Sequence, residues 1–221
     1  HAFNMGDVLN EIAYTIRPYE INVGETDKIL EEAIKYLEDI LEQRKPQTNS
    51  KTTTNKMIKT AKKIYSNVFG KEFDEIIKSL EHVGKMLDNI EVDRTKVKPI
   101  VKITGEFWAQ TTEGDGNFKM FSFLEKEGAV VKVEPIATWI TYLAHQGKQS
   151  FRDNKGLVKD ELNPSIKKKI GSLMGYYKQM TVINIAEKAY VRMYHKMIKA
   201  LKNIPHNLID QKEFASLAHD Y

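Results

Sequence analysis

Residues 99–134 read PIVKITGEFWAQTTEGDGNFKMFSFLEKEGAVVKVE, and this stretch decides the fold class. Pro99 to Thr104 is a short β-branched run that ends at Gly105, which is the pattern of a buried strand. The apolar spacing over residues 117–127 predicts an amphipathic helix, and AVVKVE predicts a second strand over residues 129–134. A strand, a helix and a strand in this order predict a βαβ unit, with two parallel strands and a right-handed crossover.

The sequences on both sides of this unit follow helical spacing. The predicted helices cover residues 5–16, 26–41, 57–68 and 73–87, a segment that starts near Pro135, residues 165–203 and residues 210–218. Thr26 is the expected N-cap of the second helix, and Gly171 and Gly175 are candidate breaks in the long one. The predicted fold class is helix-rich α/β: a helical segment over residues 1–95, then a partial parallel-sheet, Rossmann-like subdomain with long C-terminal helices over residues 96–221.

The composition is that of an ordinary soluble globular protein, with 41% hydrophobic and 29% charged residues. No window approaches the roughly 18 apolar residues that a membrane span needs, and no signal peptide is recognisable. We therefore expect a cytoplasmic protein without a membrane partner. The net charge of +4 is mild, and the lysine runs lie in helical patterns among acidic residues. Solvated helix faces are thus favoured over nucleic-acid binding.

The chain has no cysteine. Disulfides, thiolate metal ligands and cysteine nucleophiles are therefore excluded in this chain. The histidines are scattered and never pair at metal-ligand spacing, so no metal site is predicted here. The sequence also lacks the phosphate-loop, dinucleotide-binding, EF-hand and nucleophile-elbow motifs, and no catalytic residue is identified.

The segment between the first predicted strand and its helix is longer than most such connections. It lies at the carboxyl end of the strand, where open α/β sheets bind ligands. Its candidate ligand-binding residues are Gly105, Glu106, Trp108, Thr111, Thr112, Glu113, Gly114, Asp115, Gly116 and Asn117. The glycines let backbone N–H groups approach a ligand, and a helix that opens near Asn117 favours an anion. The carboxylates disfavour a bare anion, and Trp108 offers an apolar wall.

A decorated surface loop, in which Asp115 or Asn117 caps the helix, is an equally good interpretation of the same residues. A second candidate is the stretch RPYE, in which Arg17 could clamp a carboxylate or phosphate. A structural turn with an Arg–Glu pair is at least as well supported for Arg17, and the sequence assigns no role to Tyr19.

Three stretches carry a resemblance to a known family: IRPYEINVGETDKILEEAI, VKITGEFWAQTTEGDGNFKMFSFLEKEGA and VEPIATWITYL. They resemble segments of the CoA-substrate-specific enzyme activases, or activators of 2-hydroxyglutaryl-CoA dehydratase, which contain a region similar to the dehydratase D-component. The resemblance implies α/β subdomains with parallel sheets, joined by helical segments, and an iron–sulfur cluster between subdomains. It also implies associated ATPase modules that use ATP hydrolysis to drive electron transfer at low potential.

The chain departs from this family in two ways, because it has neither a cysteine nor an ATPase phosphate loop. The resemblance implies that full-length relatives carry both elsewhere. We therefore expect a non-catalytic internal fragment of an ATP-dependent reductase or activase. Its loop from Gly105 to Asn117 would line a cleft toward a cluster, a CoA thioester, another subdomain of the polypeptide or a dehydratase or activase partner.

Three functions remain open at this point, and each predicts a different structure. A fragment of an activase system predicts an open sheet edge and an apolar patch where a further subdomain packs. A self-contained module that binds a small anion or metabolite predicts a closed fold with more strands and a pocket at residues 105–117. A structural scaffold predicts that substitutions in this loop change nothing measurable.

Overall fold

The structure is a computed structural model of the 221-residue chain, and it describes residues 1–43, 70–112, 114–155 and 165–201. Its elements are α1 (Ala2–Ile16), η1 (Arg17–Tyr19), α2 (Glu25–Glu42), α4 (Lys71–Asp88), β1 (Ile100–Ile103), α5 (Phe107–Thr111), η2 (Asp115–Asn117), α6 (Met120–Lys126), β2 (Val130–Val133), α7 (Ile136–Asp153) and α8 (Ile166–Ala200). The fold is therefore helix-rich α/β, as predicted. Among the described helices, none is both long enough and apolar enough to cross a bilayer.

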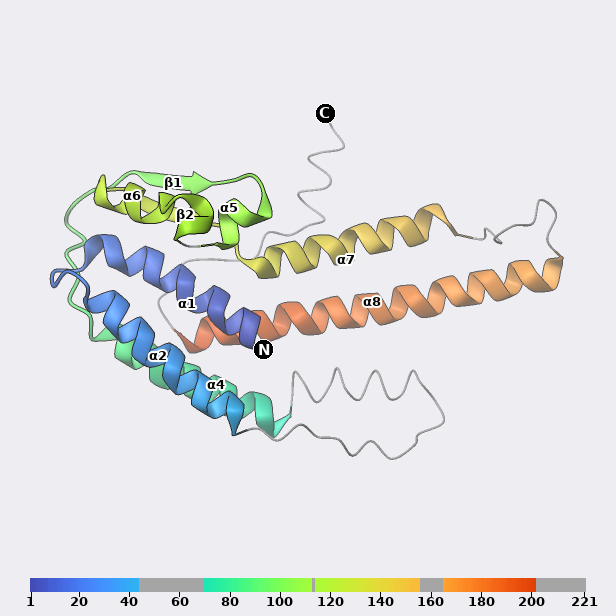
Figure 1. The fold of residues 1–221 in the computed structure, drawn as a ribbon. Helices are drawn as coiled ribbons and strands as arrows, with labels where there is room; N and C mark the ends of the chain where they lie inside the picture. Colours follow the sequence, from blue (N-terminus) through green and yellow to red (C-terminus); the bar gives the residue numbers. More distant parts are fainter. Residues whose placement is uncertain (44–69, 113, 156–164, 202–221) are drawn as a thin grey trace.

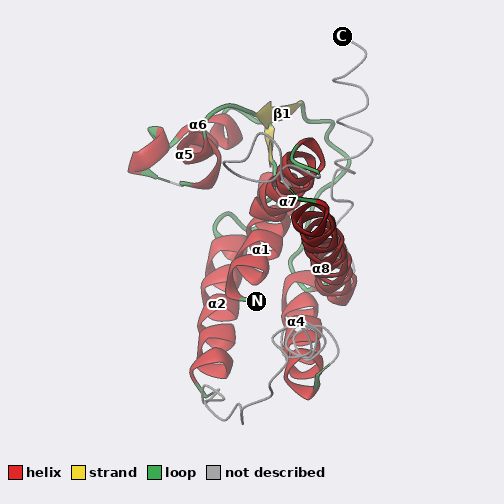
Figure 2. Cartoon of the chain, turned by 90° about the vertical axis from the view of Figure 1, so that its right-hand side faces the viewer, coloured by secondary structure: helices red, strands yellow, loops and turns green. Residues whose placement is uncertain are grey.

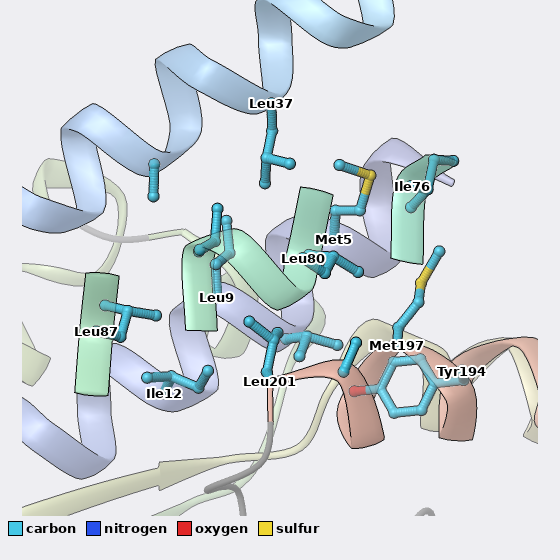
Figure 3. Packing of buried hydrophobic residues seen from close by; sticks show 14 of the residues in the cluster. Met5, Leu9, Ile12, Leu37, Ile76, Leu80, Leu87, Tyr194, Met197 and Leu201 are labelled. Carbon is cyan, nitrogen blue, oxygen red and sulfur yellow. The ribbon is translucent and has the colours of Figure 1, made fainter. Parts of the chain in front are cut away.

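The larger core lies between α1, α2, α4 and the C-terminal end of α8. Figure 3 shows how it is filled, with Met5, Leu9 and Ile12 from α1 meeting apolar residues of α4 and α8. Figure 2 shows α1 between α2 on one side and α8 on the other. Helices from both sides of residue 95 share this core, and the division of the chain near residue 95 stays a prediction.

The turn between α1 and α2 is held by charged side chains of the RPYE stretch. The Glu20 carboxylate accepts the backbone N–H groups of Gly24 and Thr26, at 2.7 and 2.9 Å, and so caps α2. The prediction that Thr26 is the N-cap is wrong, because helix α2 already begins at Glu25 and the Thr26 side chain is buried in its first turn. The Glu20 side chain, six residues before Thr26, provides the cap that was expected from the Thr26 hydroxyl.

The βαβ unit is confirmed, with β1 and β2 parallel and Ile100 in register with Val130. Its small core contains Ile103, Val131, Phe121 of α6 and Tyr14 of α1. Side chains alternate between the two faces of a strand, so the Ile100–Val130 pair and the Lys102–Lys132 pair point to the opposite face. The described helices thus cover one face of this sheet, whereas doubly wound parallel sheets are covered on both. Figure 1 shows the unit alongside α1, on the side away from α2 and α4.

The predicted start of the helix in this unit is wrong. Helix α6 begins at Met120 rather than near residue 117, because Phe118 and Lys119 adopt left-handed backbone angles, with φ of 57° and 55°. The segment before it is not a continuous loop either, since it contains α5 and η2.

Helix α8 runs without a break through both of its candidate breaks, Gly171 and Gly175. The predicted helices over residues 57–68 and 210–218 lie outside the described residues.

Leu80→Ala tests the larger core. Leu80 is fully buried on α4, so we expect its truncation to lower the free energy of unfolding by about 2–5 kcal/mol, through lost burial and the cavity left behind. Urea denaturation measures this change. Leu143→Ala is the matched control, because the same side chain on α7 is 54% exposed, and it should cost less than about 1 kcal/mol. Equal effects of the two substitutions would contradict the described core.

Candidate functional site

A small recess lies at the carboxyl end of β2, which is the position that the strand order predicts for a site. It encloses about 50 Å³, where one water molecule needs about 10–15 Å³. The recess thus has room for a few waters and is far below the roughly 300 Å³ of a typical small-molecule pocket. Its lining residues are Asp7, Asn10, Glu11 and Tyr14 of α1, Gln110 and Thr111 of α5, and the run Val133, Glu134, Pro135 and Ile136.

The Asp7 carboxylate joins α1 to the start of α7. It accepts the backbone N–H groups of Ile136 and Ala137, at 3.0 and 2.9 Å, and these donors have no partner within their own helix. Burial of the carboxylate raises the pKa of Asp7 from 3.8 to about 6, the two hydrogen bonds oppose this shift, and the nearby charge of Glu11 adds to it. Asp7 is therefore a group that can exchange a proton close to neutral pH.

A layer of buried polar groups extends from Asp7 toward α8. The Tyr190 hydroxyl donates a hydrogen bond of 2.8 Å to Oδ1 of Asn4. Burial raises the pKa of Tyr190 and of Tyr194, and the negative charge of Asp7 raises both further. The Tyr194 hydroxyl is buried without a hydrogen-bond partner among the described residues. Both phenols therefore stay protonated and neutral beside the carboxylates.

The recess is acidic, since three carboxylates line it and none of its lining residues is cationic. Glu134 also forms an ion pair of 2.5 Å with Lys102, which lies on the outward face of β1. An acidic, narrow recess disfavours phosphates and carboxylates and suits water or a hydrogen-bond donor. The described residues contain no group of three or more His, Cys, Asp or Glu side chains arranged to hold a metal ion.

The predicted loop residues lie partly in helical turns and partly at the surface. Gly105 has a φ of 128°, which favours glycine, and Glu106 is the exposed N-cap of α5. Trp108 follows on α5 with 68% of its surface exposed. Of those predicted residues that the structure describes, Thr111 is the one that reaches the recess. The loop therefore contributes one edge of the recess and presents its aromatic residue to solvent.

The second half of the loop folds on itself. The Thr112 hydroxyl donates to the carbonyl of Trp108, and a Cβ on Gly116 would lie 2.9 Å from Cβ of Thr112, which explains a glycine at that place. Gly114 has a φ of 95° and accepts the N–H of Lys119 at 2.7 Å. Glu113 lies outside the described residues, as does the side chain of Asp115. A glycine-rich sequence is thus used here for compact local packing.

Asn117 and Phe118 are the unusual residues of this segment. Asn117 is 95% buried, and its side-chain amide has no hydrogen-bond partner among the described residues. Phe118 is 95% exposed and has a left-handed backbone, a conformation that costs about 1 kcal/mol or more for a bulky residue. Because the Phe118 ring is exposed, its packing in the described fold does not offset this cost. Strain of this kind, retained at an exposed aromatic residue, points to a role outside the chain's own stability.

Arg17 has a structural role in the described chain, in agreement with one of the two interpretations of RPYE. Its guanidinium bridges Asp27 of α2 at 2.8 Å and Glu125 of α6 at 3.1 Å, and thereby ties the bundle to the βαβ unit. The Tyr19 ring lies under the charges of Arg94 and Lys98, at 5.5 and 5.8 Å. The carboxylates that Arg17 binds are those of Asp27 and Glu125, which belong to the chain and not to a ligand.

Sequence reasoning missed the polar residues of α1, of which Asp7 and Glu11 line the recess. Asn4, Asp7 and Glu11 follow one another at helical spacing within an otherwise apolar stretch, so they form a polar line on a helix that is largely buried. This pattern was the available signal. It does not say which element faces the line, and that element, the start of α7, lies about 130 residues away in sequence.

Comparisons of the chain with protein-family models, with curated proteins and with solved structures find no match. The resemblance to the activase group therefore rests on the three stretches quoted above. The activity, cofactors and partners that it implies stay predictions.

Asp7→Asn tests the electrostatics of the recess. Because the folded-state pKa of Asp7 is raised to about 6, its contribution to stability is complete below pH 3.8 and is lost as the pH rises through 6. We expect the free energy of unfolding of the unsubstituted chain to fall by up to about 3 kcal/mol more over this range than that of the variant. Urea denaturation at half-unit steps from pH 3.5 to 7.5 measures the difference.

Asp74→Asn, at an exposed position in the first turn of α4, is the matched control for Asp7→Asn. It should follow the pH dependence of the unsubstituted chain over the same range. Parallel curves for all three proteins would show that the Asp7 carboxylate is not buried as described.

Proposed function

We propose that this chain is a non-catalytic part of an ATP-dependent iron–sulfur activase or reductase system related to the activators of 2-hydroxyacyl-CoA dehydratases. In this proposal its βαβ unit belongs to a Rossmann-like subdomain, and the end of the unit around residues 105–123 packs against a further α/β subdomain of the system. The observation that carries the proposal is the incomplete sheet: the described chain holds two parallel strands, with helices on one face.

Two parallel strands are below the three or more that an independently stable sheet usually needs. Parallel sheets also occur mostly with both faces and both edges covered by other elements. The open sheet edge expected of a fragment is thus present in the described part of the chain. A subdomain that adds strands or helices would complete the unit.

The surface for this contact lies at the loop end of the unit rather than on the outward face of the sheet. Lys102 and Lys132 stand in register on that face and are exposed, and two cations side by side favour hydration. At the loop end, Trp108, Phe118 and Phe123 are 68%, 95% and 59% exposed. Large apolar side chains exposed on so small a unit are typical of a surface that another protein part covers.

The chain's own residues do not fit an iron–sulfur cluster. It has no cysteine to supply a thiolate, and the described residues offer no grouped alternative ligands. In the proposal the cluster and the ATP site belong to other parts of the system, and this chain supplies a protein wall. The acidic recess repels the phosphates of a CoA thioester, so such a ligand would lie on the side of Trp108 and Phe118.

The recess itself does not suit a small anion. A volume of about 50 Å³ with three carboxylates in its lining is too small for most metabolites and has the wrong charge for an anion.

Phe118→Asn tests the proposal, because asparagine tolerates a left-handed backbone and lacks the apolar surface. In this chain alone, we expect the substitution to raise the free energy of unfolding by a few tenths to about 1 kcal/mol. In the native protein or complex, purified without oxygen, we expect it to weaken ATP-dependent reduction of the cluster and to leave the iron and sulfide content unchanged.

Val23→Asn is the matched control for Phe118→Asn, since Val23 is also apolar and is 96% exposed, before α2. It should change neither the stability nor the reduction. A native protein without iron or sulfide would overturn the iron–sulfur assignment. Normal cluster reduction in the Phe118 variant would overturn the docking role of the loop end.

A further inference from the structure

Among the described residues, positive charge is concentrated on helix α8. It contains eight lysine and arginine residues and one acidic residue, Glu187, which gives this helix a net charge of +7. The whole chain has a net charge of +4, so the other residues together carry −3. The single acid is also neutralised, because Glu187 pairs with Lys148 of α7. Within the described part of the chain the positive charge is therefore gathered on this helix, while residues 44–69, outside that part, carry seven further lysine and arginine residues and no acid.

The first half of α8 projects from the bundle. The residues of α8 that pack against the larger core begin at Ala189, while the helix begins at Ile166 and is roughly 50 Å long. Figure 1 shows this half extending away from α1, α2 and α4 beside α7, and continuing beyond the end of α7. The Lys148–Glu187 pair fixes the antiparallel register of the two helices. The first turns of α8 thus lie past the last residues of α7.

An apolar stripe follows the projecting half. Its exposed residues are Ile166 at 78%, Ile170 at 53%, Met174 at 57%, Tyr177 at 57% and Ile185 at 48%. At 3.6 residues per turn, these positions fall within a sector about 100° wide. The same sector continues into the exposed Lys188 and Arg192, and Lys167 and Lys178 border it. A narrow apolar seam edged by cations is the surface that an amphipathic helix of opposite charge fits.

We propose that the projecting half of α8 is a docking surface for an acidic amphipathic helix of a partner protein. The apolar stripe would receive the apolar side of that helix, and the bordering lysines would pair with its carboxylates. Charge complementarity selects this occupant. A second copy of the chain would bring two helices of charge +7 together, which repels. A membrane surface is disfavoured because α8 contains no tryptophan or phenylalanine, the residues that typically anchor such helices in lipid.

This surface is separate from the loop end of the βαβ unit, and the inference goes beyond the proposed function. It requires neither a cluster nor ATP, so its test does not depend on either. A failure of the activase assignment would leave it standing.

The test uses the full chain and two synthetic helical peptides with leucine at the a and d heptad positions. One peptide has glutamate at the remaining positions and the other has lysine. Fluorescence anisotropy measures binding at 50 and 300 mM NaCl. We expect the glutamate peptide to bind at least tenfold more tightly than the lysine peptide, with an affinity that falls at the higher salt concentration.

Two double variants locate the contact. Ile170→Ser with Tyr177→Ser removes apolar anchors, and Lys167→Glu with Lys178→Glu reverses bordering charges. Each should weaken binding of the glutamate peptide at least tenfold, with unchanged helix content and melting temperature by circular dichroism. The control, Ile21→Ser with Val23→Ser, removes two apolar side chains that are 56% and 96% exposed before α2, and should leave the affinity unchanged.

Three results would overturn the inference. The first is equal or absent binding of the two peptides, or equal effects of the α8 and control variants. The second is binding to vesicles of phosphatidylcholine and phosphatidylglycerol that the same α8 variants abolish, which would assign the stripe to a lipid surface. The third is a dimer in light scattering that dissociates when the stripe is substituted, which would assign it to a second copy.

Discussion

Helix α1 lies where the two cores of the molecule meet, and it contacts α2, β2, α7 and α8. Its apolar residues fill the larger core, while Tyr14 near its C-terminal end belongs to the small core of the βαβ unit. Between them, the Asp7 carboxylate receives two N–H groups at the start of α7. A single helix therefore sets the position of the bundle, the sheet and the antiparallel pair of α7 and α8. Because both cores depend on it, they should open together.

In the described part of the chain, charge is concentrated in two places. Carboxylates gather at the recess near the carboxyl end of β2, where burial raises the pKa of Asp7 to about 6. Cations gather on α8, whose projecting half lies away from the bundle. Separated charge of this kind orients partners before contact. An acidic surface is drawn to α8 and repelled from the recess, so the two ends of the molecule select different neighbours.

The described chain offers surfaces for assembly more clearly than it offers a reaction centre. Its parallel sheet is too small to stand alone, and Phe118 keeps an exposed aromatic ring on a strained backbone. The recess is narrow and acidic, and among its lining residues none is a serine, cysteine or lysine nucleophile. These features support the proposal that the chain is part of a larger system. The identity of that system rests on the family resemblance and stays a prediction.

Local patterns in the sequence determined the strands β1 and β2, their parallel order, and helices α1, α2, α4, α7 and α8. The apolar residues of a strand or helix recur every 2 or 3.6 positions, and this periodicity can be read from neighbouring residues alone. They did not determine the start of α6, since the left-handed angles of Phe118 and Lys119 leave no periodic trace. The tertiary structure alone decided the recess. Asp7 and the N–H groups it accepts are about 130 residues apart, and a carboxylate's burial and pKa are set by whatever packs over it.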